Sequence, residues 1–298
     1  MEPIYESGHD PLRPTMTPRI EDLTPFFADG CWMFVLLARR APVGIILRRG
    51  PTEWWRVTLW DTQRDRFQGG QWFRGRIYPD KCDVSPDGKL FVYFAGKWRP
   101  RNRALGYRDT WTAVSHPPYL TALALWPVGD TYGGQGIFIE DRTLLVNRLY
   151  EHHPAHPPGP LRILDLASRS RRDSHGSVVP SWQNGWHGIL GAGDALRPFE
   201  LRKPSGSLIL GRTVETDHAY PSRRRTLYTL YRAPGETVAL FEAHWADWDQ
   251  EGRLVATVGG RVFAGKLAAR NKLVWRQLSA MQEEKPGGIE APGWARRW

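Results

Sequence analysis

The chain has 298 residues, of which 41% are hydrophobic and 24% charged, and it contains 15 Trp, 10 Tyr and 11 Phe. This apolar content is sufficient for a packed core and excludes global disorder. The 41 Lys and Arg residues outnumber 31 Asp and Glu residues, giving a formal net charge of +10, which favours an anionic partner such as nucleic acid or an acidic protein face.

Residues 1–20 are predicted to form an N-terminal extension. This segment is polar and proline-rich, so it lacks the apolar centre of a secretory signal. The longest apolar run, residues 31–38, is too short to cross a membrane as a helix. The two cysteines, Cys31 and Cys82, are expected to be buried thiols in a reducing compartment rather than a disulfide framework or zinc site. We therefore expect a cytoplasmic protein without membrane association.

A hairpin pattern recurs through residues 21–280, in which a semi-apolar strand leads through a turn to a strongly apolar strand. Five copies occupy residues 24–37, 82–94, 126–139, 202–210 and 246–257. The clearest turn is Ser85-Pro86-Asp87-Gly88. Proline fixes φ, aspartate bonds its own backbone, and glycine supplies positive φ, so such a turn reverses the chain between paired strands.

The spacing of the turns indicates the size of the repeated unit. The anchoring glycines are Gly30, Gly88, Gly136, Gly206 and Gly252. Their spacing averages about 55 residues, longer than the roughly 40 to 45 residues of a compact propeller blade, so loop insertions are required. Two further strands follow the turn in three units, at residues 43–48 and 54–61, 226–231 and 237–242, and 261–267 and 273–278. The pattern predicts four antiparallel strands per unit.

The turn Ser85-Pro86-Asp87-Gly88 with its following strand, and residues 57–61 (VTLWD) as an outer strand, resemble the blades of WD-repeat and TolB-like β-propellers. The resemblance extends over residues 22–279, although the Gly-His dipeptide that opens a WD-repeat blade is missing. It implies an all-β fold, a β-propeller of five blades with four antiparallel strands each, with six or seven blades as alternatives. It also implies use as a rigid binding platform. Residues 281–298 form a C-terminal tail that either lies across the ring or is loose.

The second unit contains a long loop, residues 95–109, in which cations alternate with two aromatic residues. Its candidate partner- or anion-binding residues are Lys97, Trp98, Arg99, Arg101, Arg103, Tyr107 and Arg108. Arginine and lysine can neutralise phosphates while tryptophan and tyrosine stack on bases, as in a single-strand nucleic-acid binder. The same composition suits a docking loop for an acidic protein. Together with the proline-rich loop at residues 151–160, we expect it to project from the ring and recognise a partner.

The loop at residues 151–160 contains His152, His153 and His156. Neutral imidazoles so close together can hold a transition metal. The neighbouring prolines keep the segment extended and prevent the one-face geometry of histidines on a helix, so a solvated loop insertion is the preferred interpretation. The sequence leaves metal binding by this loop open.

Catalytic signatures are weak. The pair His9-Asp10 resembles the start of the first blade in five-bladed glycoside hydrolases, which need two or three carboxylates converging in a central funnel. Asp29, Asp87 and Asp249 lie in or beside tight turns, where capping the backbone explains them.

Other enzyme motifs give no better candidate. No Gly-x-Ser-x-Gly motif occurs, and the glycines at residues 133–136 precede a strand instead of opening a helix that binds phosphate. We therefore predict no catalytic residue, no metal site and no cofactor.

The predicted function is that of a non-catalytic cytoplasmic β-propeller that serves as a scaffold or adaptor for another protein. One alternative is binding of nucleic acid or another polyanion through the arginine- and aromatic-rich loops. Another is a five-bladed glycoside hydrolase or lyase. The partner's identity and the oligomeric state remain open.

Overall fold

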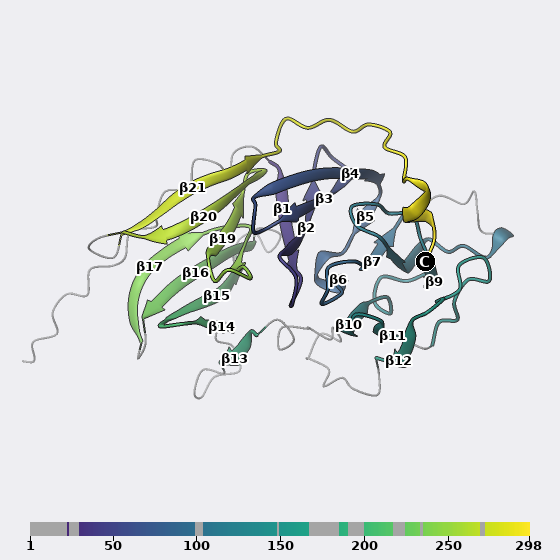
Figure 1. Ribbon diagram of the computed structural model, residues 1–298, viewed down its shortest axis with the longest axis horizontal. Helices are drawn as coiled ribbons and strands as arrows, with labels where there is room; N and C mark the ends of the chain where they lie inside the picture. The colour runs from purple at the N-terminus through teal and green to yellow at the C-terminus, as the bar shows by residue number, and fades with distance from the viewer. Residues whose placement is uncertain are drawn as a thin grey trace, which may run out of the picture.

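The computed structural model describes residues 23, 30–98, 104–147, 149–166, 185–189, 200–216, 224–232, 235–268 and 272–298. These residues form an all-β structure of five separate sheets, without an α-helix (Figure 1). The predicted all-β class is confirmed. Nothing in the described chain is a helix with the length and apolar character needed to cross a lipid bilayer.

The first two sheets are antiparallel. The first follows the chain as β1 (Trp32–Leu37), β2 (Val43–Arg49), β3 (Trp54–Asp61) and β4 (Arg66–Arg74). The second has the order β5 (Arg76–Ile77), β7 (Phe91–Gly96), β8 (Thr110–Ser115) and β9 (Ala124–Pro127), with β6 (Asp83–Val84) also paired to β7.

The other three sheets also keep chain order. The third contains β10 (Gly136–Glu140), β11 (Thr143–Val146) and β12 (Arg162–Asp165), the last two being parallel. The fourth contains β13 (His187–Ile189), β14 (Glu200–Ser205), β15 (Leu208–Thr216), β16 (Arg224–Arg232) and β17 (Glu236–Glu242). The fifth contains β18 (Trp245–Trp248), β19 (Leu254–Val258), β20 (Arg261–Leu267) and β21 (Leu273–Ala280).

Strand β7 shows why the sheets stack on one another. All six of its residues are buried, as expected when both faces of a strand are covered. Because side chains alternate along a strand, Phe91 and Tyr93 join the apolar cluster shared with the first sheet, while Val92 joins the cluster shared with the third. The second sheet is therefore packed between its two neighbours.

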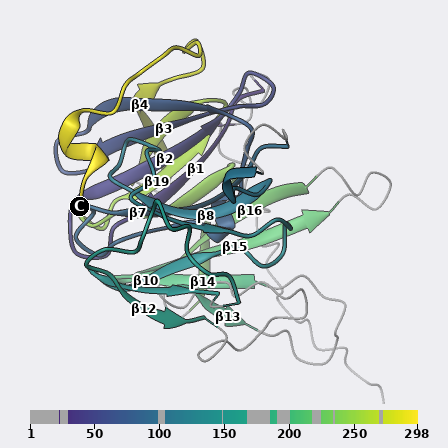
Figure 2. The same cartoon turned by 90° about the vertical axis from the view of Figure 1, so that its right-hand side faces the viewer.

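The remaining contacts place the sheets in a single sequence of neighbours. Strand β1 contacts β6 on one side and β18 and β19 on the other, and β10 contacts β6 and β7. The order in space is thus fourth, fifth, first, second and third sheet, so the last sheet of the chain packs against the first. In Figure 2, β1–β4 lie above β7 and β8, and β10 and β12 lie below them.

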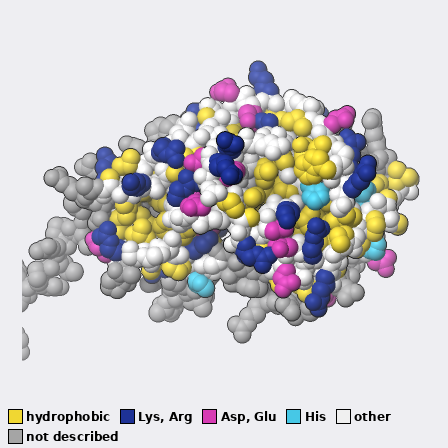
Figure 3. Space-filling model, in the orientation of Figure 1, with side chains coloured by type: hydrophobic (Ala, Val, Ile, Leu, Met, Phe, Trp, Pro, Cys, Tyr) yellow, Lys and Arg dark blue, Asp and Glu magenta, His cyan; other side chains and the backbone are white. Residues whose placement is uncertain are grey.

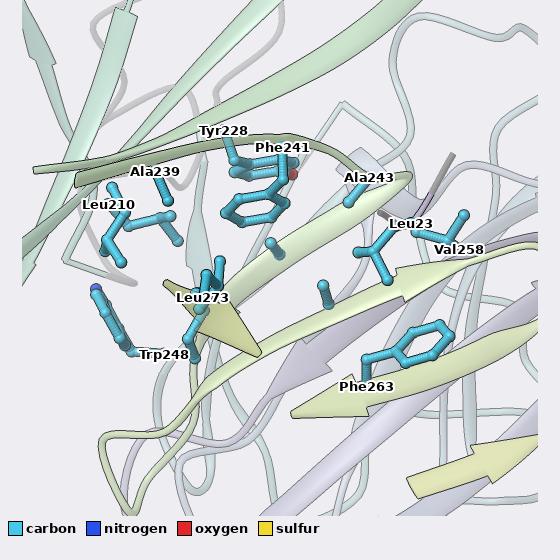
Figure 4. Close-up of a cluster of buried hydrophobic side chains, with 14 of the residues drawn as sticks. Leu23, Leu210, Tyr228, Ala239, Phe241, Ala243, Trp248, Val258, Phe263 and Leu273 are labelled. Atoms are coloured by element: carbon cyan, nitrogen blue, oxygen red, sulfur yellow. The ribbon is translucent and has the colours of Figure 1, made fainter. Parts of the chain in front are cut away.

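One large core joins the fourth and fifth sheets (Figure 4). The rings of Tyr228 and Phe241 stack with centroids 5.5 Å apart. Leu210 lies beside them from β15, and Trp248 and Phe263 contribute from the fifth sheet. This core contributes a large share of the apolar burial that stabilises the fold.

Three of the five predicted hairpins are observed as paired strands. The turns at residues 85–88, 206–207 and 249–252 connect β6 to β7, β14 to β15 and β18 to β19. The leading strand of the first predicted copy, residues 24–29, lies outside the described residues.

The third predicted hairpin, residues 126–139, is wrong. Strand β9 pairs with β8, and β10 pairs with β11, so these two strands belong to different sheets. Between them, Asp130 accepts hydrogen bonds from the backbone of Tyr132 and Gly133 in a local turn. A turn therefore forms where the sequence predicts one, but β9 and β10 pair with other strands because of the packing of the sheets. The strand number also departs from the predicted four: the third sheet has three strands, two of them parallel, and the second and fourth sheets have five each.

The C-terminal tail is packed rather than loose. After β21 it runs past β4 toward the second sheet (Figure 1), and its end lies beside His116, whose Nε2 is 3.1 Å from the carbonyl oxygen of Arg297. Gln71 Nε2 donates to the carbonyl of Ile289 at 2.9 Å, and the Trp294 ring lies 5.7 Å from the rings of both His116 and Tyr119. The tail thereby ties the first sheet to the second.

Candidate functional site

A cavity of about 730 Å³ opens at the ends of the first two sheets, and we call it the rim cavity. Its basic side chains are Arg49, Arg74, Arg76 and Lys97. Its aromatic side chains are Trp32, Trp55, Tyr78 and Trp98. Two carboxylates, Glu53 and Asp80, complete the charged lining. The volume lies within the range of small-ligand pockets, roughly 300 to 1,000 Å³.

Strand pairing brings these distant residues together. Arg76 of β5 pairs with Gly96 of β7, so Lys97 and Trp98 follow directly beside it. The approach is close at Gly75, where a Cβ atom would lie 2.5 Å from the carbonyl oxygen of Gly96. Glycine at this position therefore allows the end of the first sheet to meet the second.

The cations of the rim cavity are available to a ligand. Arg49, Arg74, Arg76 and Lys97 are all exposed. The only ion pair described among them joins Arg74 Nε to Glu53 Oε2 at 3.5 Å, and both side chains are more than half exposed. Such a pair contributes at most about 1 kcal/mol and can be exchanged for a ligand anion at little loss.

Aromatic groups form the apolar part of the rim cavity. The rings of Trp32 and Trp55 meet edge to face with centroids 6.0 Å apart. The guanidinium carbon of Arg76 lies 4.9 Å from the centroid of the Tyr78 ring. Trp98 is 56% exposed, so its ring is free to cover a bound group.

The predicted binding loop is divided by the structure. Lys97 and Trp98 line the rim cavity, whereas Arg108 is exposed beside Gly129 at a separate hollow. Tyr107 is partly buried, with its ring stacked on His153 at a centroid distance of 4.2 Å and its hydroxyl 3.0 Å from Nε2 of His156. Arg99, Arg101 and Arg103 lie outside the described residues. Arg49, Arg74 and Arg76 were missed because they are distant in sequence, although the Arg48-Arg49 pair is visible there.

The histidine loop at residues 151–160 is mostly exposed, as predicted for a solvated insertion, but it is anchored at His153. His153 is 7% exposed, its backbone N–H donates to Leu125 O, and the Leu125 N–H donates to His156 O, so the loop covers the edge of β9. Burial and the nearby His153 lower the pKa of His156. Within the described ranges, no group of three His, Cys, Asp or Glu side chains has metal-binding geometry. The two loops expected to project from the ring contact one another through Tyr107, His153 and His156.

A second cavity of about 500 Å³, the central cavity, lies between β1, β14, β18 and the 3-10 helix η2 (Pro79–Lys81). Its carboxylates are Asp80, Asp247 and Asp249, and its cations are Arg39, Lys203 and Arg212. Three tryptophans, Trp186, Trp245 and Trp248, supply its aromatic walls. The lining is thus of mixed charge.

Two of these carboxylates are held by protein groups. Asp247 Oδ1 is 2.7 Å from Lys203 Nζ, and its Oδ2 accepts from Trp186 Nε1 at 3.1 Å. Burial raises the pKa of Asp247, while the Lys203 ammonium opposes that shift. Asp249 accepts hydrogen bonds from the backbone of Glu251 and Arg253, which is the turn-capping role predicted for it.

A scan against models of known protein families found no match, and a search of curated proteins found no similar sequence. The site geometry alone therefore carries the functional argument.

Proposed function

We propose that the chain is a five-bladed β-propeller that acts as a non-catalytic interaction module and binds an acidic segment of a partner protein in the rim cavity. Two features support the propeller. The fourth, fifth, first, second and third sheets follow one another in space, so that the last sheet of the chain packs on the first, and similar Asp- and Gly-containing turns lead from β6 to β7 and from β18 to β19. Blades of a propeller bury their faces against one another in this way.

The observation that carries the binding proposal is the gathering of four exposed cations and four aromatic side chains around one cavity. Carboxylates of an acidic peptide can form charge-assisted hydrogen bonds with Arg49, Arg74 and Arg76. Its apolar side chains can contact Trp32 and Trp98. Aromatic and arginine side chains are also enriched at the centres of protein–protein interfaces.

Nucleic acid is the second candidate for the same cavity, because the exposed Trp98 ring beside Lys97 is suited to base stacking. An acidic peptide is favoured by the distribution of charge. In the face shown in Figure 3, Lys and Arg are scattered among apolar and acidic groups instead of forming a continuous track.

The enzyme alternative is less supported. A glycoside hydrolase needs converging carboxylates that are free to act as acid, base or nucleophile. In the central cavity Asp247 is paired with Lys203, and Asp249 is engaged in its turn. We retain the cytoplasm as the proposed location, in keeping with the free buried thiols of Cys31 and Cys82.

The test measures binding of a fluorescent glutamate-rich peptide to the full chain by anisotropy. The triple variant Arg49→Gln, Arg74→Gln, Arg76→Gln is expected to bind at least about tenfold more weakly than the wild type, because three charge-assisted contacts are lost. The matched control is Arg66→Gln, Arg142→Gln, Arg162→Gln, which removes equal charge from exposed positions outside the cavity. It is expected to change the affinity by no more than about twofold.

A parallel titration uses a single-stranded oligothymidine over a range of salt concentrations. The proposal predicts tighter binding of the peptide than of the oligonucleotide. If the two triple variants lose peptide affinity equally, the rim cavity is not the binding site. Tighter oligonucleotide binding that falls steeply with salt and depends on the cavity arginines would replace the acidic peptide with nucleic acid.

A further inference from the structure

The central cavity contains polar groups that the fold does not use. Arg212 lines it from β15, and no hydrogen bond or ion pair to this side chain is found in the described part of the chain. Its Nε is fully buried without an acceptor. A guanidinium without a hydrogen-bond partner at a cavity wall is unfavourable, so the terminal nitrogens of Arg212 are candidate ligand contacts.

Lys203 and Asp80 add further hydrogen-bonding capacity. An ammonium group has three donors, and Asp247 Oδ1 is the acceptor described for Lys203 Nζ. Asp80 is exposed and lines the same cavity, where its carboxylate can accept hydrogen bonds from hydroxyl groups. The cavity thus has hydrogen-bond donors, Lys203 and Arg212, on β14 and β15 and an acceptor, Asp80, in η2.

The aromatic walls complete the requirements for a ring-shaped ligand. Trp186, Trp245 and Trp248 all line the cavity. Trp186 and Trp248 are fixed in orientation because their ring nitrogens donate to Asp247 Oδ2 and to the carbonyl of Lys203. Rigid flat faces next to charged groups fit a molecule with an apolar ring face and a polar edge.

We infer that the central cavity binds a small acidic sugar of the uronic acid type, with its carboxylate held by Arg212. A guanidinium is well matched to a carboxylate because it can donate two parallel hydrogen bonds. The sugar hydroxyls bond to Lys203 and Asp80, and a ring face lies on a tryptophan. The available donors and acceptor favour a polyhydroxylated acid over an aromatic acid, because only the hydroxyl groups of the former can donate to Asp80. The volume of about 500 Å³ is sufficient for such a ligand.

The test uses the full chain and follows saturation-transfer NMR and intrinsic tryptophan fluorescence. The probes are galacturonate and glucuronate, with galactose and glucose as neutral counterparts. The wild type is expected to bind the two acids about tenfold more tightly than the neutral sugars, a difference typical of a carboxylate–guanidinium contact. Arg212→Gln is expected to abolish this preference.

Two further variants separate the site from folding and from the rim cavity. Arg212→Lys retains the charge but loses the bidentate geometry, so it is expected to keep part of the preference. The rim triple variant Arg49→Gln, Arg74→Gln, Arg76→Gln is expected to bind the sugar acids as the wild type does, whether or not the acidic-peptide proposal holds. The inference is overturned if the wild type binds none of the four sugars, if it binds acids and neutral sugars equally, or if Arg212→Gln keeps the preference.

Discussion

The segments at residues 82–88 and 246–252 follow the same local pattern but are packed differently. Each begins with a buried aspartate, Asp83 at 3% exposure and Asp247 at 6%, and burial raises the pKa of both. Asp83 is enclosed by two other sheets, since Arg39 lies 3.5 Å away and the Phe138 N–H donates to it. Asp247 faces the central cavity instead.

The turns that follow these aspartates differ in the same way. The turn at residues 85–88 is held on both sides, because the Arg40 N–H donates to Pro86 O and the Asp87 N–H donates to Asp141 Oδ1. The turn at residues 249–252 contacts the first sheet through Gln250, which donates to Ala38 O, while its other side lines the central cavity. Both turns therefore hold a neighbouring sheet, and the second turn also forms part of a cavity wall.

The largest expected effect concerns the two aspartates. Asp83→Ala should lower the free energy of unfolding by about 3 kcal/mol, since it leaves Arg39 and the Phe138 N–H without their buried acceptor. Asp247→Ala should lower it by only about 1 to 2 kcal/mol, because water in the cavity can hydrate Lys203. Urea denaturation followed by circular dichroism measures both. If Asp247→Ala lowers the free energy of unfolding as much as Asp83→Ala does, or more, the proposed difference between the two aspartates is wrong.

The two turn glycines give a matched pair of smaller effects. Both have positive φ, +74° at Gly88 and +71° at Gly252. A Cβ at Gly88 would lie 2.8 Å from Val43 Cβ, whereas at Gly252 the nearest atom is Ser205 Oγ at 3.5 Å. Gly88→Ala is therefore expected to destabilise the fold by about 2 to 3 kcal/mol and Gly252→Ala by about 1 kcal/mol. Thermal melts of the two variants compare their stabilities. Equal losses of stability would show that a Cβ at residue 88 does not clash with Val43.

A pH dependence of the Asp83 contacts is also expected. Burial raises the pKa of Asp83 from 3.8 to about 6, against the opposing effect of Arg39. Because the folded carboxyl holds its proton more tightly than the unfolded one, its contribution to stability is complete below about pH 4 and is lost as the pH rises through about 6. The difference in unfolding free energy between wild type and Asp83→Asn should fall by about 2 kcal/mol over that range.

That difference is measured by urea denaturation at a series of pH values. Taking the variant as reference removes the common contribution of the other carboxylates. If the difference in unfolding free energy stays constant between pH 4 and pH 6, or grows, burial does not raise the pKa of Asp83.

Local turn chemistry made much of the fold predictable from sequence. The Asp and Gly residues around 85–88 and 249–252 specify tight reversals, and the apolar runs beside them became β7 and β19. The strands at residues 54–61 and 261–267 were also predicted with their observed bounds. Pairing partners were less predictable, since the Asp130 turn separates two sheets instead of joining a hairpin.

The candidate site could be predicted only in part. Lys97 and Trp98 were recognisable because cations and aromatics adjoin in one loop. Arg49, Arg74 and Arg76 come from β2, β4 and β5, and only the pairing of β5 with β7 brings these strands to the loop. Tyr107 was indistinguishable in sequence from an exposed binding residue, although it packs against His153.

The proposed propeller requires the five sheets to lie around one axis, so a crystal structure of the full chain is the most direct test. A closed ring around the central cavity requires the sheet β10–β12 to lie next to the sheet β13–β17. Two stacked sheets without rotational pseudo-symmetry, or another sheet inserted between these two, would contradict it.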